Sequence, residues 1–180
     1  MWPQLPPTKR LSARSSRRLP DLPVHLLIAG SDAPDSYREK SKQLGIAERC
    51  RWESPRQDVM DLYAAADVYV SPSLEDSFGL PVAEAMACGL SAITSACAGV
   101  SEIVRDGADG FVLREPADAQ ALAQLLRRLH ADAEMRRRVG EAAAKAARSW
   151  DWDRNADEVW TLLRETRARK YSVADAEGKP

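Results

Sequence analysis

Short apolar runs alternate with longer polar stretches between residues 25 and 113. The apolar runs carry Val, Ile and Leu at consecutive positions, which is typical of strands buried on both faces of a parallel sheet. The polar stretches have apolar residues at helical spacing, so they predict the crossover helices of an α/β fold. We expect strands at 25–30, 50–54, 67–73, 91–95 and 110–113, and helices at 35–45, 58–66, 79–88 and 99–107.

Beyond Pro116 the pattern is helical only. Three helical stretches follow, and in the first of them Leu122, Leu125, Leu126 and Leu129 fall on one helix face. The predicted fold class is therefore α/β: a Rossmann-like parallel sheet with helices on both faces, closed by C-terminal helices. We expect a tail with the remnant of a helix at 1–20, one Rossmann-like domain at 21–170, and a disordered tail at 171–180.

Composition narrows the class of protein. The chain has 180 residues, 44% of them hydrophobic, and a net charge of -1, which fits one globular domain and does not favour a nucleic-acid partner. The basic residues within 1–18 predict at most weak peripheral contact with an anionic membrane surface. No apolar run approaches the roughly 20 residues that cross a bilayer, so we expect a cytoplasmic protein.

Candidate chemistry is concentrated between Glu75 and Gly89, in the sequence EDSFGLPVAEAMACG. The segment follows a predicted strand and enters a predicted helix, which is where ligands bind in doubly wound sheets. Phe78 to Leu80 fall at the start of the helix, where free backbone amides can face an anion. Gly79 has no Cβ, so a phosphate or a sugar hydroxyl can approach the backbone closely.

Two carboxylates bracket this loop. Glu84 can accept two hydrogen bonds at once and so suits the vicinal hydroxyls of a ribose or a hexose, while Asp76 would face a bound sugar. Each carboxylate also has a purely structural interpretation. Glu84 could offset the helix dipole from the first turn, and Asp76 could hydrogen-bond its own backbone.

The same segment resembles the donor-binding, C-terminal domain of family 4 glycosyltransferases with the GT-B fold, also known as glycosyl transferases group 1. That family carries a glutamate, seven residues and a second glutamate, a spacing that falls here on Asp76 and Glu84. Further similarity lies in AGSD after the first predicted strand, in DVYVSPS before the motif, and in TSACAGVSEIVRDGADGFVL after it. The resemblance covers roughly residues 12 to 170.

The resemblance implies a retaining transfer of a sugar from a nucleoside-diphosphate donor, without a metal or another cofactor. It makes Asp76 the candidate catalytic residue, contacting the transferred sugar, and Glu84 the ligand of the donor ribose. The implied substrate-binding residues are Glu75, Ser77, Phe78, Gly79, Leu80 and Glu84. Aspartate is one methylene shorter than the glutamate of the family, and Glu75 beside it stands at the wrong spacing to replace it.

Some features of the family are not found in the sequence before His25. Donor domains of this family open with a strand that ends in Gly-Arg, with a Lys nearby, and no such strand or Gly-Arg and Lys pair occurs there. We therefore expect a sheet that lacks its first, central strand, and an N-terminal acceptor domain supplied from elsewhere. We favour a truncated glycosyltransferase chain; the alternatives are the donor subunit of a split glycosyltransferase and a non-catalytic nucleotide-binding or interaction module.

Overall fold

The computed structural model describes residues 23–30 and 35–176, with side chains described as far as residue 170. The tail expected at 1–20 lies outside these residues. The chain divides into two compact units, Met1–Ala147 and Arg148–Pro180, which are described separately below.

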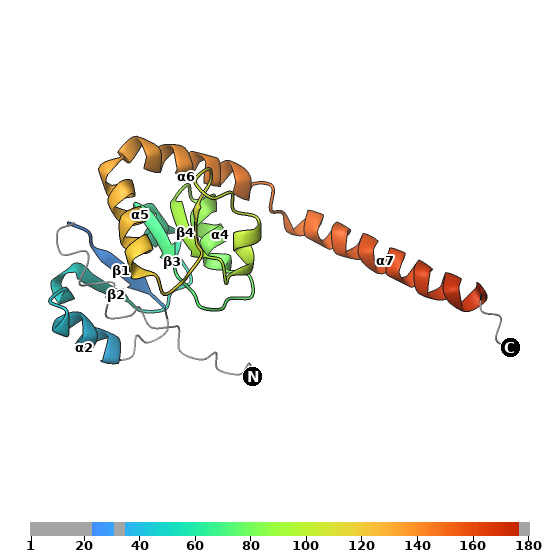
Figure 1. Ribbon diagram of the computed structural model, residues 1–180, viewed down its shortest axis with the longest axis horizontal. Helices are drawn as coiled ribbons and strands as arrows, with labels where there is room; N and C mark the ends of the chain where they lie inside the picture. Colours follow the sequence, from blue (N-terminus) through green and yellow to red (C-terminus); the bar gives the residue numbers. More distant parts are fainter. Residues whose placement is uncertain (1–22, 31–34, 177–180) are drawn as a thin grey trace. The chain divides into compact units, whose positions relative to one another are not determined.

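The first unit contains the strands and helices in the order that the sequence predicts (Figure 1). Its strands are β1 (Leu26–Ala29), β2 (Cys50–Glu53), β3 (Val68–Ser71), β4 (Ser91–Ser95) and β5 (Phe111–Leu113). Its helices are α2 (Asp35–Gln43), α3 (Met60–Ala64), α4 (Leu80–Ala87), α5 (Ala119–Ala131) and α6 (Ala133–Ala147), with short 3-10 turns at Ala47–Arg49 and Gly99–Glu102.

The helix expected at 99–107 is much shorter in the structure, where only the 3-10 turn Gly99–Glu102 forms. The residues that follow use their side chains to hold a loop. Asp109 is fully buried and accepts hydrogen bonds from the Arg105 amide at 2.7 Å and the Arg105 Nε at 2.6 Å. Gly107 has a φ of 75°, and Asp106 accepts a hydrogen bond from the Val112 amide. Aspartates that bond nearby backbone compete with helix formation, which ends the helix early.

All strand pairs in the described residues are parallel, and they form two separate ladders. β1 pairs with β2, while β3, β4 and β5 form the second ladder with β4 in its centre. Every residue of β4 is buried, whereas each residue of β3 is only partly buried. Among the described strands β1, β2, β3 and β5 have one partner each, and the absence of a first, central strand from the sheet stays a prediction.

Helices cover both faces of the second ladder (Figure 1). On one face Ile93 and Phe111 pack with Leu122 and Leu129 of α5, and Met135 and Val139 of α6 complete this cluster. On the other face α4 buries Val82, Ala85 and Met86. The predicted α/β class, with a parallel sheet between helices, is therefore confirmed.

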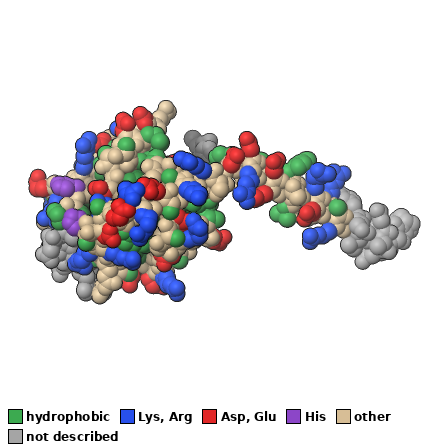
Figure 2. Space-filling model, turned by 90° about the horizontal axis from the view of Figure 1, so that it is seen from above, with side chains coloured by type: hydrophobic (Ala, Val, Ile, Leu, Met, Phe, Trp, Pro, Cys, Tyr) green, Lys and Arg blue, Asp and Glu red, His purple; other side chains and the backbone are tan. Residues whose placement is uncertain are grey.

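The second unit consists mainly of α7 (Trp152–Ala176), which continues beyond residue 170, where the sequence predicts a tail. Its large apolar side chains are exposed, among them Trp152, Trp160 and Leu163. No helix among the described residues is both long and apolar enough to span a membrane. Acidic and basic side chains are interspersed on the face of the molecule that Figure 2 shows, in keeping with the net charge of -1.

Candidate functional site

The candidate site is the loop at the carboxyl end of β3, together with the start of α4. Its backbone is joined to the loop that follows the neighbouring strand β4. The Asp76 amide donates to the Cys97 carbonyl at 3.2 Å, the Gly99 amide donates to the Asp76 carbonyl at 3.3 Å, and the Val100 amide donates to the Phe78 carbonyl at 2.7 Å. Two loops from adjacent parallel strands thus form one continuous edge, where ligands bind in this type of sheet.

Hydroxyl groups at the ends of β3 and β4 hold this edge together. The Ser95 hydroxyl, which is fully buried, donates to the Ser73 carbonyl and accepts from the Cys97 amide at 3.3 Å. Ser71 and Ser73 share a hydrogen bond of 3.3 Å between their hydroxyl groups. From the sequence we do not single out these serines, although a small polar residue such as Ser95 inside a fully buried strand is a recognisable signal.

Two glycines allow the loops to approach each other. Gly79 is the N-cap of α4 and has a φ of 90°, in the left-handed region, and a Cβ there would lie 3.2 Å from the Cγ1 of Val100. A Cβ on Gly99 would lie only 2.4 Å from the Ser77 carbonyl oxygen. Both positions therefore require glycine, the first for its backbone conformation and both for space.

Asp76 is partly buried, and its side chain serves the loop itself. Its Oδ1 accepts a hydrogen bond from the Phe78 amide at 3.2 Å. Asp76 therefore bonds the backbone of its own loop, as its structural interpretation predicts, and the Phe78 amide already has an acceptor. Within the described part of the chain, the amides of Gly79 and Leu80 have no acceptor and remain available at the start of α4.

Glu84 lies in the second turn of α4, since the helix begins at Leu80 and has no acidic residue in its first turn. The structure therefore excludes the alternative that Glu84 is a first-turn residue offsetting the helix dipole. The side chain is exposed, and its Oε2 accepts a hydrogen bond of 2.8 Å from the Tyr63 hydroxyl. Among the described residues Oε1 has no hydrogen-bond donor, so this oxygen can accept from a ligand.

Two tyrosines, which our sequence reasoning did not place in the site, lie beside these carboxylates. The ring of Tyr63, from α3, packs edge-on against the ring of Tyr69, from β3, with 5.9 Å between their centres. Burial and the hydrogen bond to Glu84 raise the pKa of Tyr63 far above its usual value. Burial, followed by the charges of Glu84 and Asp76, raises the pKa of Tyr69 to about 12. Tyr69 therefore lies within the fields of both predicted carboxylates.

The remaining predicted residues lie on the solvent side of the same loop. Glu75 and Ser77 are exposed, and so are the apolar side chains of Phe78 and Leu80. The structure thus brings all seven predicted residues into one loop and helix start. No group of three or more His, Cys, Asp or Glu side chains in the described ranges is arranged to hold a metal ion, and the absence of a metal requirement stays a prediction.

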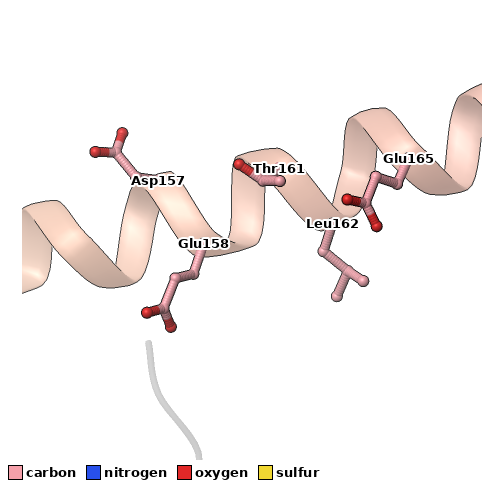
Figure 3. A pocket seen from close by; sticks show the side chains of 5 residues that line it. All are labelled: Asp157, Glu158, Thr161, Leu162 and Glu165. Carbon is pink, nitrogen blue, oxygen red and sulfur yellow. The ribbon is translucent and has the colours of Figure 1, made fainter.

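A separate shallow hollow lies on α7 (Figure 3). The side chains that line it are Asp157, Glu158, Thr161, Leu162 and Glu165. All of them come from this single helix, and Figure 3 shows them spread along its length. Because no second element of the described residues contributes a side chain, we assign no site of convergent groups to this hollow.

A parallel sheet between helices, with free amides and an exposed carboxylate at its carboxyl edge, defines a Rossmann-like domain. The profile of the family described as "Glycosyl transferases group 1" matches residues 11–146. The chain belongs to this family.

A curated relative from Thermomonospora curvata, a D-inositol 3-phosphate glycosyltransferase, is 35% identical over 162 residues. The match covers 82% of this chain but only 37% of the relative. The solved structure of sucrose-phosphate synthase from Thermosynechococcus elongatus has a TM-score of 0.74 and 26% identity, covering 87% of this chain and 42% of that one. Anabaena HepE in complex with UDP-glucose has a TM-score of 0.76 at 23% identity, covering 90% of this chain and 47% of that one, a likeness of fold.

Proposed function

We propose that this chain is the donor-binding half of a retaining glycosyltransferase that takes a nucleoside-diphosphate sugar as its donor. The observation that carries the proposal is the position of Glu84. Its exposed carboxylate lies at the carboxyl edge of the parallel sheet and has one oxygen without a donor in the described residues. The relatives support the same chemistry, since they are glycosyltransferases and one solved neighbour holds UDP-glucose.

In this proposal Glu84 accepts hydrogen bonds from the ribose hydroxyls of the donor. A carboxylate can accept from two vicinal hydroxyls at once, and hydrogen bonds to a charged acceptor are stronger than neutral ones. The amides of Gly79 and Leu80, at the positive end of the α4 dipole, would receive the diphosphate or a sugar hydroxyl. Both contacts use groups that can still form hydrogen bonds, because they lack a partner among the described residues.

Asp76 would contact the transferred sugar through its second carboxylate oxygen, Oδ2. Its Oδ1 accepts from the Phe78 amide, which fixes the side chain within the loop. A fixed carboxylate loses little side-chain entropy when it binds a ligand, which favours recognition of a sugar hydroxyl. Glu75 and Ser77, exposed on either side, complete the proposed substrate-binding set.

The acceptor site belongs to another part of the enzyme in this proposal. The chain spans 37% of the length of its relative from Thermomonospora curvata, so the acceptor half of such an enzyme has no counterpart in the matched region. An N-terminal acceptor domain or a separate acceptor subunit is therefore a proposed partner. Among the described strands β1 and β3 each pair with one neighbour, so a separate subunit would add a strand by pairing with the backbone of either one.

One observation favours a second candidate, a non-catalytic nucleotide-binding module. The residue at the expected catalytic position is the shorter Asp76, and one of its oxygens is committed to the loop backbone. A module of this kind would bind the nucleotide through Glu84 and transfer no sugar. Joining the chain to the acceptor half of a relative and assaying sugar transfer separates the two functions, because any transfer that depends on Asp76 contradicts the module.

Donor binding is tested by calorimetric titration of the chain with UDP, GDP and ADP and with the corresponding diphosphate sugars. We expect at least one nucleotide to bind, and we expect Glu84→Gln to weaken its binding about tenfold or more, because hydrogen bonds to a charged group contribute about 1.5 to 3 kcal/mol. Glu141→Gln, an exposed glutamate of α6, is the matched control and should leave the affinity unchanged. Failure of every nucleotide to bind would overturn the proposed function.

A further inference from the structure

Tyr63 is the only described side chain that donates a hydrogen bond to Glu84, at 2.8 Å to Oε2. The two residues are far apart in the sequence, with Tyr63 in α3 and Glu84 in α4. The Tyr63 hydroxyl also lies 3.4 Å from the Pro81 carbonyl oxygen, one turn before Glu84 on the same helix. The hydroxyl therefore contacts α4 at two points on the side where Glu84 lies.

Tyr63 is itself held in place. Its ring packs edge-on against Tyr69 at a centroid distance of 5.9 Å, and Tyr69 belongs to β3, the strand that leads into the candidate loop. An aromatic side chain has two rotatable torsions, so packing of the ring fixes the position of the hydroxyl. Glu84, by contrast, is exposed on a helix surface, where a glutamate alone would sample many rotamers.

We propose that Tyr63 is the residue that positions the Glu84 carboxylate for the ribose diol, and that it thereby sets the preference for ribonucleotides over 2′-deoxynucleotides. This inference rests on the donor-binding role proposed for Glu84. Because Oε2 accepts from Tyr63 and Oε1 has no donor among the described residues, Oε1 can accept from a ribose hydroxyl. Because Tyr63 already orders the Glu84 side chain, this side chain loses less conformational entropy when it binds the ribose.

The position of the proton supports this arrangement. Burial of the Tyr63 ring and the hydrogen bond to Glu84 raise the pKa of Tyr63 far above neutral pH. The tyrosine therefore keeps its hydroxyl proton, which it donates to Oε2 of Glu84. The polarity of the contact is thus fixed, and Glu84 retains its acceptor capacity for the sugar hydroxyls.

The test compares the wild-type chain with Tyr63→Phe, which removes the hydroxyl and keeps the ring. Calorimetry measures the affinity for whichever of UDP, GDP and ADP the wild type binds, and for its 2′-deoxy counterpart. We expect Tyr63→Phe to weaken binding of the ribonucleotide about tenfold and to leave the 2′-deoxynucleotide nearly unchanged. Tyr69→Phe removes a hydroxyl from the neighbouring ring that does not bond to Glu84, so it should preserve the ribose preference.

A double-mutant cycle with Glu84→Gln separates positioning from general stability. If Tyr63 acts through Glu84, adding Tyr63→Phe to Glu84→Gln should produce no further loss of affinity. Equal losses for both nucleotides, or additive effects of the two substitutions, would overturn the inference while leaving donor binding intact. A wild-type chain that binds none of the diphosphates would overturn both the inference and the proposed function.

Discussion

At the scale of single residues, the position of Gly79 requires both a left-handed backbone conformation and the absence of a side chain, and only glycine meets both requirements. Its φ of 90° lies in the left-handed region, which costs a residue with a side chain about 1 to 2 kcal/mol. The residue is also buried, with Val100 Cγ1 3.2 Å from the position that a Cβ would take. The backbone turn that starts α4, and with it the free amides of the candidate site, depends on both conditions.

We expect Gly79→Ala to lower the free energy of unfolding by more than the backbone cost alone, by about 2 to 3 kcal/mol. The matched control is Gly107→Ala, since Gly107 has a φ of 75° but open space around its Cβ position. The control should cost about 1 to 2 kcal/mol, the backbone cost alone. Urea unfolding of both variants measures the difference, and equal losses would show that Val100 does not crowd the turn.

The carboxylates and the tyrosines differ in how far the sequence could predict them. Asp76 and Glu84 lie within one loop and helix, so their spacing in the sequence already placed them on the same edge. Tyr63 falls at helical spacing within the helix predicted at 58–66, and this spacing does not distinguish a packed ring from a residue of the site. Its contact with Glu84 depends on how α3 lies against α4, and local spacing contains no information about that tertiary arrangement.

At the scale of elements, the sequence predicted the order of strands and helices because each strand is a compact apolar run between polar helical stretches. The expected helix at 99–107 was too long, because helical spacing did not reveal that Asp106 and Asp109 bond the backbone of a loop. The described strands form two separate ladders, and the missing central strand that we expect from the absent family residues stays a prediction. Hydrogen bonds from aspartate side chains to nearby backbone therefore explain why the helix expected at 99–107 ends early.

The central strand β4 allows a test of how its buried hydroxyl groups contribute to the free energy of unfolding. Thr94 Oγ1 has no hydrogen-bond partner in the described residues, whereas the neighbouring Ser95 bonds the Ser73 carbonyl. A buried hydroxyl without a partner costs about 1 to 3 kcal/mol, so Thr94→Val should raise the free energy of unfolding by about 1 kcal/mol. Ser95→Ala should lower it by about 1 to 2 kcal/mol, because it leaves the Ser73 carbonyl unpaired.

Denaturant unfolding of the two β4 variants at the same temperature measures these opposite signs. Both substitutions lie in one fully buried strand and change the size of the side chain little, so each serves as the control for the other. A loss of stability in Thr94→Val would contradict the expectation, since it would mean that the hydroxyl has a partner, such as a buried water molecule.

At the scale of the whole molecule, the two units differ in how their apolar residues are used. The buried hydrophobic residues from Val82 to Ala143 all belong to the first unit, and so do both carboxylates and both tyrosines of the candidate site. In the second unit the described side chains of α7 are exposed, including Trp152 and Trp160. The first unit therefore contains both a core and the candidate site within its own sequence.

We therefore expect a chain that ends at Ala147 to unfold cooperatively at nearly the temperature of the full chain and to bind the same nucleotide with the same affinity. The reason is that neither the core cluster nor the candidate site uses a residue beyond Ala147. A chain that ends at Arg128 is the control, because it lacks Leu129, Met135 and Val139 of the core cluster and should lose cooperative unfolding. Calorimetric scans and nucleotide titrations of the three chains measure unfolding and binding. If removal of α7 abolishes cooperative unfolding, the core of the first unit does not suffice for its fold. The donor-binding half would then include α7.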